Sequence, residues 1–424
     1  MSVDTQEHVP TGQLPVVVEH SRSGPAHSAG PERLVTPTFV VAWVVNFLQY
    51  LTFYMLVTTM ALYAVKSFAA SDAVGGFASS AFVVGATLAR LVSGYLVDAL
   101  GRRRMLLIAL VVVAVACALY IPAGSLPVLI AVRMVHGFGY AFASTAVMTI
   151  AQSVIPDSRR GEGTGYFALG TTLATAIGPA LGLFLVGNLD YTWLFWTTLA
   201  TAVLGLVLGI FLREPLAHQE AKAERSEFSL SDIAHPSVLP IGSFMLVVGV
   251  CYAGVITYLN AYAEDRGVTT GAALFFVAYA VAMLIMRLVL GKVQDQRGDN
   301  VVVYLGLICF AVALGILAVA TQDWQVVVAG AMTGLGYGTL MPAAQAIAVS
   351  AVPAHKLGTG ISTLLLLMDV GVGIGPVVLG LLLSATGFGT MYTVLAVLVV
   401  VAAVLYHAVH GRHPHAKRGR LAVD

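Results

Sequence analysis

Long apolar runs alternate with short polar turns along most of this chain. A helix needs about 20 mostly apolar residues to cross the hydrocarbon core of a bilayer. Twelve runs approach or exceed this length, with ends defined to within a few residues. They cover residues 38–65, 75–98, 104–122, 126–155, 161–187, 190–212, 238–264, 270–294, 300–320, 324–352, 356–386 and 388–410. The pattern predicts an all-α integral membrane protein with twelve transmembrane helices.

The composition agrees with a bilayer as the solvent of this chain. Hydrophobic residues make up 58% of the sequence, charged residues only 10%, and the mean hydropathy is +0.88. Soluble domains carry roughly a quarter charged residues. The net charge of +1 gives no reason to expect nucleic acid as a partner.

Lysine and arginine in short loops mark the cytoplasmic side of a membrane protein. With the N-terminus placed inside, the outer loops carry only Lys66 and Arg266. The inner loops and the C-terminal tail collect Arg102, Arg103, Arg104, Arg159, Arg160, Arg213, Lys222, Arg225, Lys292, Arg297, Lys356, Arg412, Lys417, Arg418 and Arg420. We therefore expect a multi-pass protein of the cell (inner) membrane with both termini cytoplasmic.

The polar segments divide the chain. Residues 1–34 are rich in Pro, Gly, Ser and His without a periodic apolar face, which predicts a disordered cytosolic tail. Residues 213–237 predict a cytosolic linker between a six-helix half at 35–212 and a second at 238–410. Residues 411–424 form the expected cytosolic C-terminal tail.

The two predicted halves match each other at an offset of 197 residues. The matched pairs include Arg90 and Arg287, Gly94 and Gly291, Asp98 and Asp295, Gly101 and Gly298, Gly137 and Gly334, Tyr140 and Tyr337, and Gly178-Pro179 and Gly375-Pro376. In an apolar chain, such a duplication predicts a transporter built from two pseudo-symmetric halves around a site near the bilayer midplane.

Ionisable residues at membrane depth each cost roughly 2.5–3.5 kcal/mol on insertion scales, so each requires a reason. Arg90 and Arg287 are duplicates, which favours a role in the shared architecture. Arg133 and Asp369 break the symmetry, because their counterparts are Gly330 and Thr172.

Asp369 lies about 13 residues into its apolar run, roughly 20 Å from the start of a helix. Burial there disfavours the charged carboxylate, so Asp369 could take up and release a proton; the alternative is a permanent structural ion pair. Its partner could be Arg133 or Arg90. Arg133 could instead hold an anionic substrate group or bond backbone carbonyls, and His136 could relay protons or simply pack.

Two further sets of residues indicate helix contacts and a substrate cavity. Two predicted helices each carry a Gly-Pro pair in mid-helix, with further glycines nearby, which predicts pliable, closely packed helices at the contact between the halves. The residues of this motif are Gly170, Gly178, Pro179 and Gly182 in the first half, and Gly375 and Pro376 in the second. Polar and aromatic residues at helical spacing predict the lining of a substrate cavity. The predicted lining residues are Asn46, Gln49, Tyr50, Phe53, Tyr54, Arg133, Tyr140, Tyr337, Met341 and Gln345.

The turn GYLVDALGRRR resembles the signature of the major facilitator superfamily, in which Gly94, Asp98, Gly101, Arg102 and Arg103 match. The second copy, GKVQDQRGDN, keeps Gly291, Asp295 and Gly298 but has Asp299 in place of a basic residue, which predicts a weaker gating role. The segment RMVHGFGYA and the Gly-Pro segment resemble motifs of the 12-helix drug:proton antiporters.

The resemblance implies a major facilitator fold, an Asp98 that sits near the start of the eleventh helix, and an Arg133 that takes part in proton coupling. We expect a monomeric, proton-coupled exporter of amphipathic small molecules, with protons and the solute as its partners. No nucleotide-binding loop, catalytic triad or metal-ligand spacing stands in a supporting context, so we expect no enzyme activity, cofactor or metal. A metabolite, sugar or metallophore carrier and a non-transporting sensor remain as alternatives.

Overall fold

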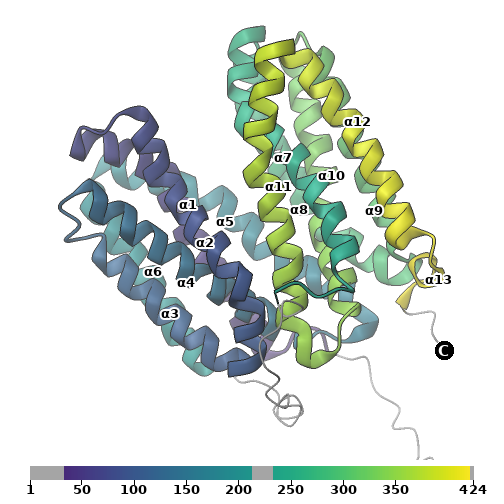
Figure 1. Cartoon of the computed structure of the whole chain (residues 1–424), viewed down its shortest axis with the longest axis horizontal. Helices are drawn as coiled ribbons and strands as arrows, with labels where there is room; N and C mark the ends of the chain where they lie inside the picture. Colours follow the sequence, from purple (N-terminus) through teal and green to yellow (C-terminus); the bar gives the residue numbers. More distant parts are fainter. Residues whose placement is uncertain (1–32, 213–232, 421–424) are drawn as a thin grey trace, which may run out of the picture. The chain divides into compact units, whose positions relative to one another are not determined.

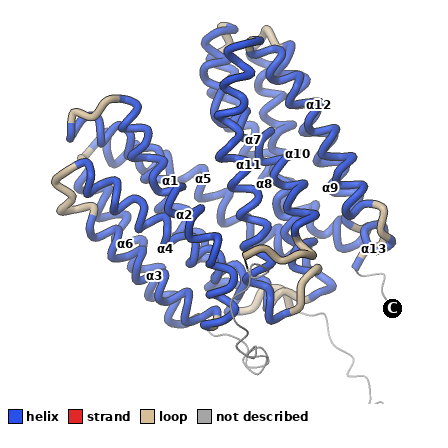
Figure 2. The backbone as a smooth tube through the Cα atoms, viewed as in Figure 1, coloured by secondary structure: helices blue, strands red, loops and turns tan. Residues whose placement is uncertain are grey.

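A computed structural model describes residues 33–212 and 233–420. The predicted disordered N-terminal tail lies outside these residues except for its last two positions, and most of the predicted linker lies outside them as well. Every regular element in the described part is a helix (Figure 2).

Each of the twelve apolar runs forms one long helix, which confirms the predicted fold class. The helices are α1 Pro37–Phe68, α2 Asp72–Leu100, α3 Arg102–Leu119, α4 Leu126–Ser153, α5 Arg160–Asn188, α6 Tyr191–Phe211, α7 Leu239–Arg266, α8 Thr269–Arg297, α9 Asp299–Val319, α10 Asp323–Ser350, α11 Leu357–Thr386 and α12 Phe388–Tyr406. A π-helical turn, His407–Gly411, and a short helix α13, Pro414–Lys417, follow α12.

Eleven helices in the described ranges are long and apolar enough to span a membrane. The exception among the twelve is α3, which has only 18 residues and begins with three arginines. The charges are confined to the first three positions of α3, so α3 remains compatible with a position among the spanning helices.

Local sequence signals set several helix ends. Thr36 caps α1, since its side chain accepts a hydrogen bond from Phe39 N at 3.1 Å. The turns α2–α3 and α8–α9 each pivot on a glycine, Gly101 with φ 95° and Gly298 with φ 91°. A side chain at either position would be strained, so the duplicated glycines allow two helices to join without a longer loop.

The helices form two groups, α1–α6 and α7–α12, with matching internal packing (Figure 1). Within the first group α2 packs on α4 and α1 on α5; within the second, α8 packs on α10 and α7 on α11. Glycines allow the closest approaches. A Cβ atom added at Gly137 would lie 1.9 Å from Phe82 O, and one at the duplicate Gly334 would lie 2.3 Å from Tyr279 O.

The groups meet mainly through two equivalent helix pairs, α2 with α11 and α5 with α8. Their contacts centre on the end of the helices that carries the turns at Gly101, 157–159, Gly298 and 354–356, which we call the motif end. A Cβ atom at Gly291 of α8 would lie 2.3 Å from Gly161 O of α5, so the two backbones touch there. The described structure is thus closed at the motif end.

Candidate functional site

The two turn-motif aspartates bind helix N-termini in the opposite group. Asp98 of α2 accepts hydrogen bonds from Gly358 N at 2.9 Å and Thr359 N at 2.7 Å, at the start of α11. The free N–H groups and the positive dipole end of a helix favour a carboxylate there. The resemblance of its turn implies an Asp98 near this helix start, and the two hydrogen bonds agree.

Asp295 of α8 makes the equivalent contacts at the start of α5. It accepts hydrogen bonds from Gly161 N and Glu162 N, both at 2.8 Å. Gly161 and Glu162 lie 197 residues before Gly358 and Thr359, so the duplication extends to the hydrogen bonds themselves. The expectation of a weaker second motif therefore finds no support in these backbone bonds.

The two arginines that follow Gly101 in the first motif have different hydrogen-bond partners. Arg102 is buried and donates a hydrogen bond to Ala354 O, which links the α2–α3 turn to the turn before α11. Arg103 instead bonds to Leu212 O at 2.8 Å and Ile210 O at 2.9 Å, at the end of α6 in its own group. Of these two arginines, Arg102 is the one that bonds across to the other group.

Arg90 in α2 is paired with Asp369 in α11. Arg90 Nε lies 2.5 Å from Asp369 Oδ2, with side-chain exposures of 5% and 22%. Ser362 Oγ in α11 also donates to Arg90 O at 2.8 Å. Of the two partners that the sequence left open for Asp369, the structure places Arg90 against it, and the pair connects the two helix groups.

Arg287, the duplicate of Arg90, has a different environment. It donates to Ala168 O of α5 and contacts Met283 Sδ at 3.5 Å, and its buried Nε has no hydrogen-bond partner in the described part of the chain. No carboxylate pairs with it among residues 33–212 and 233–420. The symmetric scaffold thus carries one compensated and one uncompensated arginine.

Arg133 lies away from this ion pair. Its side chain is fully buried, donates to Ala78 O at 3.4 Å and Ser79 O at 2.8 Å, and stands 5.0 Å from the ring centre of Phe82. These contacts tie α4 to α2 within one group, in keeping with the carbonyl-bonding alternative. Its part in proton coupling stays a prediction that no described contact supports.

His136 is also used in packing. Its Nδ1 lies 3.0 Å from Tyr120 Oη, and its ring meets Phe82 edge to face at 5.1 Å. The side chain is 1% exposed. These contacts account for a buried histidine without a proton relay.

The predicted lining aromatics form one cluster in each group. In the first group Tyr50 and Phe53 pack on Tyr140, with ring centres 5.6 and 5.8 Å apart. In the second group Tyr337 stacks on Tyr252 at 3.6 Å. Tyr337 Oη lies 3.8 Å from Met368 Sδ, the residue before Asp369, so the second cluster lies next to the helix segment that carries the ion pair.

Tyr252 and Tyr279 belong to the second cluster but were absent from the predicted lining. The repeat offered a signal for Tyr279, because its counterpart is Phe82, an aromatic residue in the first cluster. Tyr252 has no such signal, since position 55 is a methionine.

The remaining predicted lining residues are mostly buried against neighbouring helices. Asn46 and Gln49 are 1% and 3% exposed; Asn46 Nδ2 lies 3.4 Å from Thr171 Oγ1, and Gln49 Nε2 would stand 4.0 Å from a Cβ atom at Gly205 of α6. Tyr54 stacks beside Tyr50 at 6.3 Å. On α10, Gln345 is 5% exposed and Met341 is half-buried against both groups.

The glycines of the two Gly-Pro segments pack against helices of their own group. Pro179 and Pro376 do lie inside α5 and α11. However, a Cβ atom at Gly178 would lie 2.5 Å from Tyr54 of α1, and one at Gly375 would lie 2.7 Å from Ala253 of α7. Gly170 and Gly182 also face α1.

These glycines therefore bring α5 onto α1 and α11 onto α7, within each group. The helices that carry them, α5 and α11, do lie at the contact between the halves, through α8 and α2, but these glycines face α1 and α7 instead. The sequence identified close helix packing correctly but could not say which neighbour each glycine faces, because the partner depends on how the helix is rotated.

Comparisons with known proteins agree with this architecture. A family model described as "Major Facilitator Superfamily" matches residues 42–321 and 270–422. The chain is 25% identical over 381 residues to the uncharacterized MFS-type transporter YhhS of Escherichia coli strain K12, covering 87% of this chain and 91% of YhhS.

Two solved structures share the fold. The human organic anion transporter MFSD10 (TETRAN) aligns with a TM-score of 0.75 at 18% identity, covering 89% of this chain and 99% of its own. FucP, a major facilitator transporter captured in the outward conformation, also aligns with a TM-score of 0.75, at 16% identity and with the same coverage.

Proposed function

Because the chain belongs to the major facilitator superfamily, and is thus a membrane transporter rather than an enzyme, we propose that it exports amphipathic small molecules in exchange for protons by alternating access. The observation that carries the proposal is the Arg90–Asp369 ion pair, which joins α2 to α11 at membrane depth. An acid with access to water at such a junction can couple its protonation to the separation of the two groups.

The coupling follows from elementary electrostatics. With Asp369 ionised, attraction to Arg90 holds α2 against α11 and favours the state closed at the motif end. Protonation removes the negative charge and leaves a buried cation without its partner, which disfavours this closed state. Asp369 keeps 22% side-chain exposure against 5% for Arg90, so the carboxylate is the more accessible member of the pair.

The basic turns point to the cytoplasm as the side of the motif end. A proton arriving from the other side would then release the Arg90–Asp369 pair, open the motif end, and leave into the cytoplasm. Solute would bind from the cytoplasm, and its outward passage would return the transporter to the closed state with the pair reformed. This order makes proton entry drive solute exit.

The tyrosine clusters support a substrate with both apolar and hydrogen-bonding surface. Aromatic side chains offer broad apolar faces, and their hydroxyl groups offer polar contacts. The uncompensated Arg287 of α8, which donates to Ala168 O of α5, adds a cation at the contact between the two groups. Organic anions should therefore be included among the candidate solutes.

The test is purified protein in liposomes with an imposed pH gradient and an internal pH-sensitive dye, screened against cationic, neutral and anionic amphipathic solutes. The proposal predicts that some of these solutes accelerate proton movement and accumulate against their own gradient. Solute accumulation that does not depend on the pH gradient would contradict proton coupling. A response confined to one sugar or metabolite would favour the carrier alternative.

A further inference from the structure

The second turn motif lacks the basic residue of the first. Arg102 follows Gly101 in the α2–α3 turn, whereas Asp299 follows Gly298 in the α8–α9 turn. The second turn therefore holds two acids, Asp295 and Asp299, whose side chains are 2% and 8% exposed. Two nearly buried carboxylates repel each other unless a cation is shared between them.

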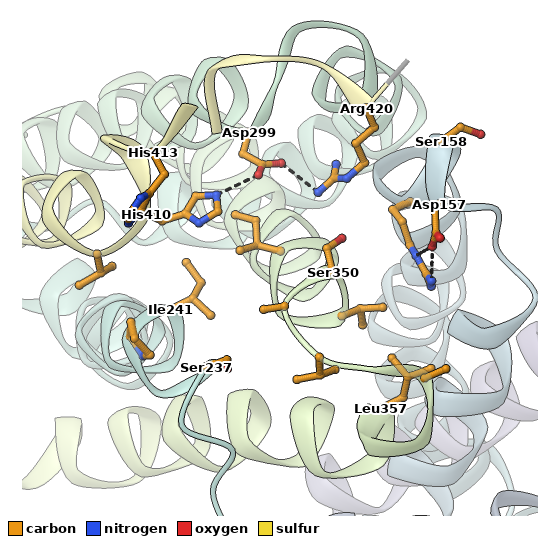
Figure 3. Close-up of a pocket in the computed structure, with 18 of the residues that line it drawn as sticks. Asp157, Ser158, Ser237, Ile241, Asp299, Ser350, Leu357, His410, His413 and Arg420 are labelled. Atoms are coloured by element: carbon orange, nitrogen blue, oxygen red, sulfur yellow. Dashed lines mark hydrogen bonds and ion pairs between the residues drawn. The ribbon is translucent and has the colours of Figure 1, made fainter. Parts of the chain in front are cut away.

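That cation comes from the C-terminal tail. Arg420 Nη1 lies 3.1 Å from Asp295 Oδ1, and Arg420 Nη2 lies 3.1 Å from Asp299 Oδ1. One planar guanidinium thus bridges both acids, a geometry that a flexible ammonium cannot reproduce. Figure 3 shows Arg420 reaching Asp299 from one side while His410 approaches from the other.

The tail that carries Arg420 is anchored along its length. Asn300 Nδ2 donates to Gly411 O at 2.8 Å, and His410 Nε2 lies 2.9 Å from Asp299 Oδ2. A Cβ atom at Gly298 would lie 2.9 Å from Ala416 O, so the backbone of α13 rests directly on the turn. These contacts hold residues 411–420 on the α8–α9 turn and thereby fix the position of Arg420.

We propose that the C-terminal tail completes the second turn motif: Arg420 supplies the cation that the α8–α9 turn lacks and so holds Asp295 on the start of α5. Asp295 Oδ1 accepts both from Arg420 and from Gly161 N of the opposite group. Arg420 acts through Asp295 as a positioning residue for closure of the motif end.

The C-terminal tail lies next to the contact between the two groups at the motif end. A pocket of about 800 Å³ opens beside this contact and is lined by both groups, with Asp157 and Arg160 on one side and Ser350, His410 and Arg420 on the other (Figure 3). Separation of the groups at the motif end would pull Gly161 away from Asp295. Loss of Arg420 should favour that separation, because Asp299 would then repel Asp295 from its place.

The experiment measures the distance across the motif end in the full-length protein. Nitroxide labels at Arg104 of α3 and Val301 of α9, both exposed, report opening by pulsed electron resonance in a background without the native cysteines. Arg420→Gln should increase the population with long distances about tenfold, in line with the loss of a charged hydrogen-bond pair. Arg418→Gln, an exposed position on the same tail, is the matched control.

Two double variants keep the outcome interpretable if Arg420→Gln also lowers expression. Asp299→Arg restores a cation at the position equivalent to Arg102, so Asp299→Arg combined with Arg420→Gln should return the distances to those of the parent. In an Asp295→Asn background, Arg420→Gln should cause no further change. The inference is overturned if Arg420→Gln behaves like Arg418→Gln, or if it opens the motif end equally with and without Asp295. All variants are compared at one pH and keep Arg90 and Asp369, so the role of Arg420 is tested whether or not Asp369 couples protons to transport.

Discussion

Arg90 and Asp369 form an ion pair between α2 and α11, with Nε and Oδ2 2.5 Å apart. Arg287, the counterpart of Arg90 in the second half, has no carboxylate partner in the described ranges. Position 172, the counterpart of Asp369, is a threonine that bonds to Ala168 O of its own helix at 3.2 Å. The internal symmetry is therefore broken at one acid.

Asp369→Asn should abolish accumulation of solute driven by a pH gradient while leaving solute–solute exchange, because the neutral side chain cannot release a proton. Both rates can be measured in the same proteoliposomes with and without the imposed gradient. A variant that still concentrates solute against its gradient would show that the coupling acid lies elsewhere.

Arg90→Gln should destabilise the protein by roughly 3 kcal/mol, the low end for a broken buried pair, because it strands the Asp369 charge. Arg90→Gln combined with Asp369→Asn should recover most of this loss, as measured by thermal unfolding in detergent. Arg287→Gln is the matched control, since it removes a duplicate arginine without stranding a carboxylate. Equal destabilisation by both single variants, with no recovery in the double variant, would argue against the pair.

Asp98→Asn and Asp295→Asn should impair cycling to a similar degree. The sequence alone predicts a smaller effect at Asp295, but both acids accept two backbone N–H bonds from the opposite group. An amide in place of either carboxylate turns one acceptor into a donor, which leaves one N–H without its bond. Initial transport rates, normalised to inserted protein, would separate equal from unequal losses.

Gly291→Ala should open the motif end, because the new methyl group would lie 2.3 Å from Gly161 O, a backbone atom of the opposite group that cannot rotate away. Gly373→Ala in α11 is the control, since a Cβ atom there meets nothing within 4 Å. Labels across the motif end should report longer distances for Gly291→Ala alone. Unchanged distances would mean that α5 and α8 do not have to touch.

Arg133→Lys should lower stability by about 1–3 kcal/mol, since a lysine cannot reach two successive carbonyls and stack on Phe82 at once. The pH dependence of transport should stay unchanged if these contacts are its whole role. A pH–rate profile displaced to higher pH by Arg133→Ala would instead favour the coupling role that the family resemblance implies, because loss of a cation lets a nearby acid keep its proton.

The sequence by itself determined the parts that depend on local properties. Apolar runs about as long as a bilayer is thick become helices because their backbone groups must bond internally. Duplicated positions such as Gly101 and Gly298 mark tight turns because only glycine tolerates the required φ without strain. The Asp98 contact was foreseen through the resemblance of its turn.

The tertiary structure decided which distant groups meet. Asp369 and Arg90 lie 279 residues apart, and whether Arg90 or Arg133 reached the acid depended on the rotation of α2, α4 and α11 and on the contact between the groups. The same holds for Gly178, which faces α1, and for Arg420, which neutralises a turn more than 100 residues before it. Such pairings carry no periodic signal, because a side chain finds its partner only after the helices have packed.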